Sequence, residues 1–430
     1  MSVFNRDEEG AGGARAMIVV PVVDGQPQSR SADARAEEAT GLAAAIGIEV
    51  AETITFRVRV LKPSTLIGGG QVDELAARVE DLSAELVIVD AAMTPVQQKT
   101  MEERTGRKVI DRTGLILEIF GERAATAEGR LQVELAHLDY QAGRLVRTWT
   151  HLERQRGGFG FLGGPGETQI EADRRMIRDR MAKIRKELEQ VKKTRALHRE
   201  RRQRAPWPVV ALVGYTNAGK STLFNRLARA EVMAKDLLFA TLDPTMRQIR
   251  VPGHDKVILS DTVGFVSDLP TQLVAAFRAT LEEVASADLI LHVRDIAHED
   301  SEAQRADVEQ VLKELGLEGE GAPPQLEVWN KLDLLHGDER RAVLGEAERR
   351  DDVVTVSALS GEGLDGLRER IGEWLDPETH VHELEIPASD GGAIAWLYQH
   401  GKVQSSETRG EMMHITVELT PDNWARFQSR

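Results

Sequence analysis

The chain has 430 residues, which is enough for two to four domains. It contains no cysteine, so disulfides, thiolate metal sites and cysteine nucleophiles are excluded. Its net charge of -15 argues against a surface that coats nucleic acid over its whole extent. No apolar run approaches the ~20 residues of a membrane span, and the first residues lack the apolar core of a signal peptide. We therefore expect a cytosolic protein, with a disordered tail over residues 1–16.

The next part of the chain, residues 17–128, alternates between strand and helix patterns. Strands are expected at 16–23, 53–60 and 86–89, and helices at 31–46 and 72–82. This alternation predicts a small α/β domain with a parallel sheet. The run Gly68-Gly-Gly70 precedes the second helix and could bind an anion. A plain tight turn is favoured, because no lysine or serine follows in the register of a phosphate-binding loop.

Residues 129–205 carry two apolar seams at alternating three- and four-residue steps, a pattern typical of helices that pack in pairs. A glycine-rich segment at 156–166 separates them, and Thr168 with Glu171 forms a capping box at the start of the second helix. We predict an antiparallel hairpin with arms of about 22 residues, each ~33 Å long. The seams are Leu131, Leu135, Leu138, Ala142, Leu145, Trp149 and Leu152, then Ile170, Ile177, Met181, Ile184, Leu188 and Val191.

The glycine-rich tip and the basic second arm suggest contact with RNA. The tip contains Phe159 and Phe161, which could insert against RNA bases or a protein pocket. They could equally fold back onto the hairpin, and the sequence leaves the two interpretations open. The Lys192–Arg204 segment is basic and nearly unopposed by acids, so it could hold a phosphate backbone in an otherwise acidic protein.

The segment Gly214–Thr222 fits the phosphate-loop pattern G-x-x-x-x-G-K-[ST] without a mismatch. An apolar, β-branched run precedes it and a helical pattern follows, as the motif requires. Gly214 and Gly219 allow a tight turn that aims backbone N–H groups at phosphate oxygens. Lys220 should reach the outer phosphates, and the Ser221 hydroxyl should hold Mg²⁺. The sequence therefore predicts a nucleoside triphosphate site in a domain that spans residues 206–376.

Four further motifs follow along the chain, and together they indicate that the bound base is guanine. Asp261–Gly264 can bind Mg²⁺ through water and offer a glycine N–H to the γ-phosphate, and Thr241 within Phe239–Asp243 is a natural second hydroxyl ligand. The carboxylate that ends Asn330–Asp333 can accept two hydrogen bonds from guanine, and Ser357–Leu359 can offer an N–H to guanine O6. Strands are expected at 209–213, 257–260, 289–293, 326–328 and 353–356.

These five motifs define the predicted site. The nucleotide-binding residues are Gly214, Tyr215, Thr216, Asn217, Ala218, Gly219, Lys220, Ser221, Thr222, Phe239, Ala240, Thr241, Leu242, Asp243, Asp261, Thr262, Val263, Gly264, Asn330, Lys331, Leu332, Asp333, Ser357, Ala358 and Leu359. The predicted metal ligands are Ser221 and Thr241, with Asp261 acting through water, and the predicted catalytic residues are Lys220, Thr241 and Gly264. The last segment, 377–430, alternates like a small β-containing domain.

The chain resembles the HflX family of ribosome-associated GTPases. The resemblance rests on the phosphate loop and on motifs at Asp111–Phe120, Leu131–Leu135, Trp149–Gln155, Gly164–Glu171, Phe239–Asp243 and Asp261–Phe265. It implies a monomer that binds the large ribosomal subunit and its rRNA, places the hairpin loop near the peptidyl-transferase centre and separates stalled ribosomes. The alternative is a GTP-dependent assembly or anti-association factor whose hydrolysis is only a switch.

Two departures from the family pattern weaken any inference of phosphate contacts where they occur. The family often carries a lysine in the N-terminal glycine motif, where this chain has Gly68-Gly-Gly-Gln71. It also often carries an arginine just before the Gly-Pro-Gly of the tip, where this chain has Phe161-Leu-Gly-Gly164. Neither departure touches the motifs that bind the nucleotide.

The residue after D-x-x-G is Phe265, where many GTPases place a glutamine that orients the attacking water. Phenylalanine cannot hydrogen-bond to water, so we expect slow intrinsic hydrolysis. The missing group could come from the ribosome, or from a K⁺ ion held by Asn217 as in some related GTPases. Asn217 could instead only support the loop, and this second interpretation is slightly favoured.

Overall fold

The computed structural model describes residues 13–25, 30–124, 126–155, 165–203, 207–228, 245–267, 284–317, 319, 322–375, 380–419 and 421–428. The chain divides into two compact units. One comprises Met1–Arg250 with Asp255–Leu367, and the other comprises Val251–His254 with Arg368–Arg430.

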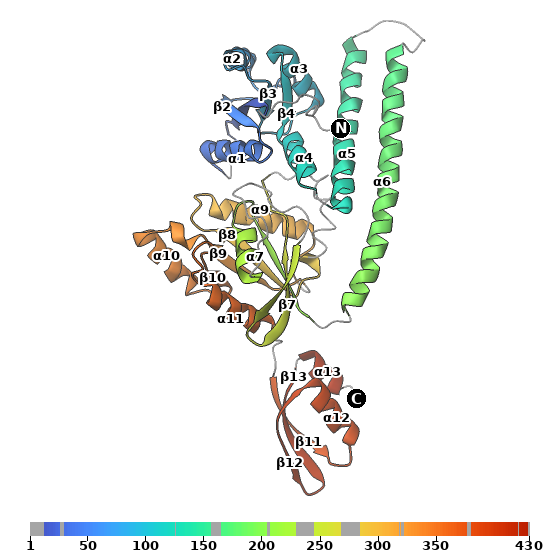
Figure 1. Cartoon of the computed structure of the whole chain (residues 1–430), viewed down its shortest axis with the longest axis vertical. Helices are drawn as coiled ribbons and strands as arrows, with labels where there is room; N and C mark the ends of the chain where they lie inside the picture. Colours follow the sequence, from blue (N-terminus) through green and yellow to red (C-terminus); the bar gives the residue numbers. More distant parts are fainter. Residues whose placement is uncertain are drawn as a thin grey trace. The chain divides into compact units, whose positions relative to one another are not determined.

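The N-terminal part of the first unit is a four-stranded parallel sheet in the order β2-β1-β3-β4. Successive residues of β1 point to opposite faces: Ala16, Ile18 and Val20 join one apolar cluster, and Met17 and Val19 join another. Helices α1 and α4 cover the first face and α2 and α3 the second (Figure 1). The strands are β1 Arg15–Val23, β2 Glu49–Val58, β3 Leu86–Val89 and β4 Lys108–Asp111; the helices are α1 Ala32–Ala44, α2 Gly69–Asp81, α3 Pro95–Thr105 and α4 Arg112–Arg123.

Two long helices follow, α5 (Ala127–Gln155) and α6 (Pro165–Gln203), and they pack against each other (Figure 1). They contain 29 and 39 residues, so both exceed the predicted 22. Helix α6 begins at Pro165 and not at the capping box three residues later. Proline suits the first turn of a helix, where its missing N–H has no partner to lose.

The predicted seam of α6 is where the helix packs, because Met181, Ile184 and Leu188 are buried. The Arg180 guanidinium also donates two hydrogen bonds to the Glu134 carboxylate of α5, at 2.6 and 2.7 Å. Helix α5 uses a second face toward the α/β sheet, where Val133 is buried. The predicted apolar seam therefore accounts for only one of the two packed faces of α5, because the helix packs against both α6 and the α/β sheet.

The rest of the first unit contains a six-stranded sheet in the order β10-β9-β8-β5-β7-β6. Strand β5 lies inside it, parallel to β7 on one side and to β8 on the other. Strand β6 at the edge was not predicted, because its exposed residues interrupt the apolar pattern. The strands are β5 Val209–Gly214, β6 Thr245–Val251, β7 His254–Asp261, β8 Leu289–Asp295, β9 Gln325–Asn330 and β10 Val353–Thr355; the helices are α7 Lys220–Ala228, α9 Ser301–Glu314, the 3-10 helix η1 Leu332–Leu334 and α10 Gly337–Ala347. Helix α11, Leu364–Leu375, begins in the first unit and continues into the second.

The second unit contains a small antiparallel sheet in the order β11-β13-β12, with helices α12 and α13. Its core includes Ile386, Leu397, Ile415 and Val417. Its elements are β11 His380–Pro387, α12 Gly391–His400, β12 Lys402–Arg409, β13 Met412–Leu419 and α13 Pro421–Gln428. The fold class expected from the sequence is confirmed: an α/β domain with a long helical hairpin, a second α/β sheet with a phosphate loop, and a small C-terminal β-sheet.

Candidate functional site: a guanine-nucleotide site

The predicted phosphate loop joins the end of β5 to the start of α7, and two of its glycines are required by close approaches. Gly214 has φ +151°, and a Cβ there would lie 2.1 Å from the Val293 carbonyl oxygen. Gly219 has φ +91°, and a Cβ there would lie 2.2 Å from the Asn330 amide nitrogen. Any side chain would collide at either position, so only glycine allows this loop to form.

Lys220 is buried at the first turn of α7, and its ammonium faces back into the loop. Its Nζ donates to the carbonyl oxygens of Gly214, at 3.0 Å, and Tyr215, at 2.7 Å. Burial lowers the pKa of Lys220 to about 8, against the opposing effect of the Asp261 carboxylate. A phosphate anion would relieve the burial penalty on this charge. The lysine is therefore arranged to gain from an anionic ligand.

Asp261 ends β7 beside the phosphate loop. The Ser221 hydroxyl donates to Asp261 Oδ2 at 2.8 Å, so two oxygen donors of the kind Mg²⁺ prefers are adjacent. No group of three or more His, Cys, Asp or Glu side chains that could hold a metal occurs among the described residues. The donor set thus fits an Mg²⁺ ion that shares its remaining ligands with phosphate and water. Thr241 lies outside the described residues, as does the whole of 239–243.

The D-x-x-G segment is fixed to the phosphate loop by two backbone hydrogen bonds. Thr216 N–H donates to the Phe265 carbonyl oxygen at 2.7 Å, and Phe265 N–H donates to the Gly214 carbonyl oxygen at 3.1 Å. Phe265 is 1% exposed. Its ring is therefore packed in the core and cannot orient a water. Thr262 does not face the loop either, because its hydroxyl donates to the Leu212 carbonyl oxygen at 2.5 Å.

The base-recognition motifs meet at Asn330, which ends β9. Its Nδ2 donates to the Ala218 carbonyl oxygen at 2.8 Å, and its Oδ1 accepts from Ala358 N–H at 2.9 Å. The Ser357 hydroxyl donates to Asp333 Oδ1 at 2.5 Å, which orients the carboxylate expected to accept from guanine. The side chain of Asn330 thus joins the phosphate loop to the 357–359 loop.

Arg226 of α7, which lies outside the predicted motifs, contacts the 357–359 loop. Arg226 donates to the carbonyl oxygens of Ala358, at 3.1 Å, and Leu359, at 2.5 Å. Lys331 has φ +66° and forms an ion pair of 2.7 Å with Asp295. Val263 and Leu332 are buried and contribute packing. Asn217 has φ +61° and is exposed.

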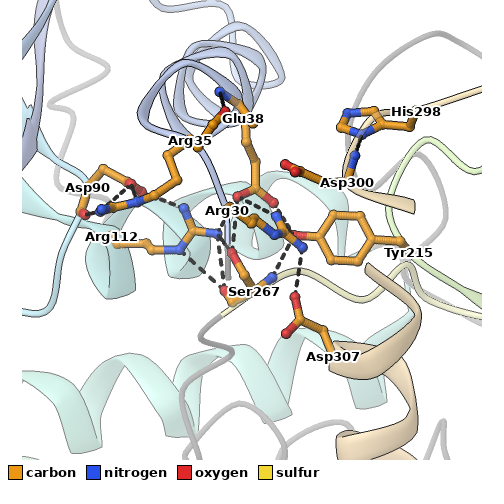
Figure 2. Close-up of polar contacts among 12 residues, drawn as sticks. Arg30, Arg35, Glu38, Asp90, Arg112, Tyr215, Ser267, His298, Asp300 and Asp307 are labelled. Atoms are coloured by element: carbon orange, nitrogen blue, oxygen red, sulfur yellow. Dashed lines mark hydrogen bonds and ion pairs between the residues drawn. The ribbon is translucent and has the colours of Figure 1, made fainter. Parts of the chain in front are cut away.

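A polar cluster that the sequence did not predict links the phosphate loop to the N-terminal sheet (Figure 2). The Tyr215 hydroxyl donates to the Glu38 carboxylate of α1. It also accepts from the Arg30 guanidinium and from Ser267 N–H, each at 2.7 Å. Arg30 further pairs with Asp307 of α9 at 2.7 Å. The only sequence signal was a bulky tyrosine inside a loop of small residues.

Arg112 forms the second half of this cluster. Its guanidinium donates to the Ser267 hydroxyl at 2.7 Å, to Glu38 at 2.9 Å and to Asp90 at 2.5 Å (Figure 2). Burial alone would raise the pKa of Glu38, but Arg112 and Arg30 outweigh it and hold that pKa below its ordinary value. Glu38 is therefore ionised, and the buried charges offset one another.

His292 is a second buried polar residue that the sequence did not mark. It lies on β8, paired in register with Val213, the residue before the phosphate loop. Burial lowers its pKa to about 4, with a smaller opposing effect from Glu327. The imidazole is therefore neutral at neutral pH, as expected for a packed core side chain.

The hairpin tip with Phe159 and Phe161 lies outside the described residues. Lys192 and Lys193 lie on α6, and the described part does not extend to their side chains. None of the helices in the described part of the chain is both long and apolar enough to cross a membrane.

Comparison with known proteins gives four matching family models in chain order. They are described as GTP-binding GTPase N-terminal (residues 33–121), GTP-binding GTPase middle region (123–202), 50S ribosome-binding GTPase (209–331) and HflX C-terminal domain (342–430). The chain is 48% identical to GTPase HflX of Magnetococcus marinus over 91% of this chain and 89% of that one. It is 46% identical to GTPase HflX of Escherichia coli over 91% of each chain.

Solved structures give a more distant likeness. A GTP-binding protein from Sulfolobus solfataricus in complex with GDP is 24% identical to the chain. The match covers 84% of this chain and 98% of that one, with a TM-score of 0.46.

Proposed function

Because this chain belongs to the HflX family of GTPases, we propose that it binds the large ribosomal subunit and separates stalled or idle ribosomes. GTP hydrolysis would then control its release. We assign nucleotide chemistry to residues 206–376 and ribosome contact to the hairpin at 129–205. The match of residues 209–331 to the 50S ribosome-binding GTPase family supports the choice of partner.

The observation that carries the GTP-binding part of this proposal is the joining of both halves of the nucleotide site by Asn330. Its amide holds the loop that would bind phosphates and the loop that would bind the base. Asp333, oriented by Ser357, has a second carboxylate oxygen with which to accept from guanine. Adenine presents no matching pair of donors, so this arrangement supports GTP as the substrate.

Each of the described site residues has a separate role in the proposed hydrolysis. Lys220 would supply positive charge to the outer phosphates, and Gly264 would donate its N–H to the γ-phosphate. Ser221 and Asp261 would hold Mg²⁺, which supplies charge to the β- and γ-phosphate oxygens when bound. The buried ring of Phe265 does nothing for the attacking water, so intrinsic turnover is slow.

The polar cluster around Tyr215 and Arg112 suggests how the state of the bound nucleotide affects the part of the chain that would bind the ribosome. Ser267 follows the D-x-x-G segment by three residues, and segments at this point move with γ-phosphate in many GTPases. Ser267 is held by Arg112 at the start of α4. Helix α5 is joined to the same sheet through Tyr140, whose hydroxyl donates to Asp111 at 2.5 Å. A shift of Ser267 would thus change the contacts of Arg112, which is next to the residue that binds Tyr140 of α5.

Sedimentation of intact ribosomes tests the proposal. The ribosomes are incubated with the protein and either GDP or a non-hydrolysable GTP analogue. Separation into subunits with the analogue and not with GDP supports splitting driven by the bound triphosphate. Binding to large subunits that only prevents their reassociation identifies the alternative, an assembly or anti-association factor. The Asp333→Asn variant is the control, because weaker binding of the guanine base should weaken separation by the GTP analogue.

Turnover measurements test the source of the missing catalytic group. We expect slow hydrolysis by the free protein in NaCl and a large acceleration by large subunits. If Asn217 holds K⁺, then KCl should also accelerate the free protein, and Asn217→Ala should remove that effect. Equal rates in the two salts leave Asn217 as a supporting residue. Fast turnover of the free protein in NaCl would show that the water-orienting group is intrinsic.

A further inference from the structure

The hydroxyl of Thr216 is a buried polar group that the fold itself does not use. The residue is 5% exposed, and its Oγ1 has no hydrogen-bond partner among the residues that the structure describes. Its backbone N–H is already committed to the Phe265 carbonyl oxygen at 2.7 Å. A buried hydroxyl without a partner is uncommon and destabilising, so its presence in a binding loop points to a partner supplied by the ligand.

Thr216 stands where the phosphate loop meets the D-x-x-G segment. A Cβ placed on Gly264 would lie 2.9 Å from Thr216 Cγ2 and 3.1 Å from Lys220 Nζ. Thr216, Gly264 and Lys220 therefore surround one point. The lysine ammonium and the glycine N–H are the groups expected to contact the terminal phosphate. The apolar branch of Thr216 faces Gly264, and the hydroxyl is the other branch of the same Cβ.

The residue after Gly264 cannot supply a polar side chain, because Phe265 is apolar and packed in the core. The Thr216 hydroxyl is thus a buried polar side-chain group beside this place, with no hydrogen-bond partner among the described residues. A threonine hydroxyl keeps its proton at neutral pH, so it acts as a hydrogen-bond donor to phosphate oxygen and not as a base. Donors aimed at developing charge in a site that excludes water lower an activation barrier.

We propose that Thr216 is a further catalytic residue whose hydroxyl donates a hydrogen bond to a γ-phosphoryl oxygen of GTP, and that this bond strengthens in the transition state. The inference rests on the proposed hydrolysis of GTP. In that reaction the water oxygen forms a bond to the γ-phosphorus while the bond to the bridging oxygen breaks. GDP leaves with the bonding electron pair, the water proton passes to the phosphate, and Thr216 keeps its own. The same contact distinguishes GTP from GDP, which has no γ-phosphoryl oxygen.

Two matched substitutions separate the hydroxyl from the rest of the side chain. Thr216→Val keeps the branched shape without the hydroxyl, and Thr216→Ser keeps the hydroxyl without the methyl group. The measurements are the single-turnover hydrolysis rate and the affinities for GDP and for a non-hydrolysable GTP analogue. We expect Thr216→Val to lower the rate about 10- to 100-fold, the loss typical of a hydrogen bond to a charged group. It should also lower analogue affinity while GDP affinity is unchanged, and Thr216→Ser should retain both.

The outcomes that would overturn the proposal are distinct from failure of the proposed function. A parental rate and a parental ratio of analogue to GDP affinity in Thr216→Val would overturn it. Equal reductions in the valine and serine variants would also overturn it, because they would assign the effect to the methyl group. If the valine variant does not fold, Thr216→Ala takes its place. If the parental protein does not hydrolyse GTP at all, the proposed function fails, and the two affinities still test the contact.

Discussion

Arg112 donates to both oxygens of Ser267, with its guanidinium 3.1 Å from the carbonyl oxygen and 2.7 Å from the hydroxyl. The pair joins the first residue of α4 to the segment that follows D-x-x-G. Arg112 is 5% exposed and is held on its other side by Asp90 and Glu38. Coupling between two sites is reciprocal. If binding of a ligand moves Ser267, it therefore changes the free energy of the Arg112–Ser267 contact, and that contact changes the free energy of ligand binding by the same amount.

Tyr215→Phe and Glu38→Gln should be non-additive in their effects on stability. Removing the tyrosine hydroxyl leaves the Arg30 guanidinium and the Ser267 N–H without that acceptor, which should cost about 1–3 kcal/mol. Groups in one network typically couple by about 0.5–3 kcal/mol, and urea denaturation of the two single variants and the double variant measures that coupling. Tyr140→Phe is the control, since its hydroxyl contacts Asp111 elsewhere. Additive effects would contradict a shared network.

Asp333→Asn should weaken GTP binding and favour xanthosine triphosphate. Asparagine replaces one acceptor oxygen by a donor, so it suits a base that presents a carbonyl where guanine presents its amine. A good bidentate base contact is worth about 1–3 kcal/mol, hence roughly ten- to a hundred-fold in affinity. Titration of both nucleotides against the parent and the variant measures the change in preference from GTP to xanthosine triphosphate. Unchanged GTP affinity would remove Asp333 from the site.

Neutralising the basic end of α6 should make large-subunit binding less sensitive to salt. Replacing Lys192, Lys193 and Arg195 by glutamine removes up to three positive charges that could each pair with a phosphate. The slope of log affinity against log salt should then fall by about 0.7–0.9 for each phosphate that is no longer neutralised. Lys183→Gln and Lys186→Gln, exposed and nearer the middle of α6, are the control. A parental slope in the triple variant would assign the basic end a role other than RNA binding.

His292 should make the protein less stable as the pH falls from 6.5 to 4. The pKa of this histidine is about 4 in the folded protein and ~6.5 when unfolded, so in that range the unfolded state binds more protons. Its contribution is fully present above pH 6.5 and is lost as the pH falls toward 4, by up to about 3 kcal/mol. Denaturant unfolding of the parent and of His292→Gln at several pH values isolates it. The exposed His336→Gln is the control, and a pH dependence unchanged in His292→Gln would show that His292 is not the group.

The phosphate loop and the strands with long apolar runs could be predicted from the sequence, because each has a local signal. The run Leu86–Val89 is uniformly apolar and forms β3 with the predicted bounds. Strand β4, Lys108–Asp111, has only two apolar residues between charged ends, so its pattern was too short to register. Helix α4 follows it without a break, and the capping carboxylate of Asp111 is also the last residue of the strand.

The polar cluster could not be predicted because its members are far apart in the chain. Glu38 and Tyr215 are separated by 177 residues, and Arg112 and Ser267 by 155. Neither periodicity nor spacing connects such residues, and each reads as an ordinary charged or polar position on its own element. The Thr216 hydroxyl was placed in the site by the motif alone, while the absence of an internal partner required the packed structure.

The two hydrogen bonds of Asn330 use only groups of the protein, the Ala218 carbonyl oxygen and the Ala358 N–H. The protein's own contacts therefore hold the loops at the base end together, and we expect binding to cost little conformational entropy there. A ligand that carries the guanine base and a diphosphate should meet this end as a nearly rigid receptor, with fast association and little heat-capacity change from loop folding. Structural differences between the diphosphate and triphosphate forms should then be confined to the opposite end, around Gly264 and Ser267.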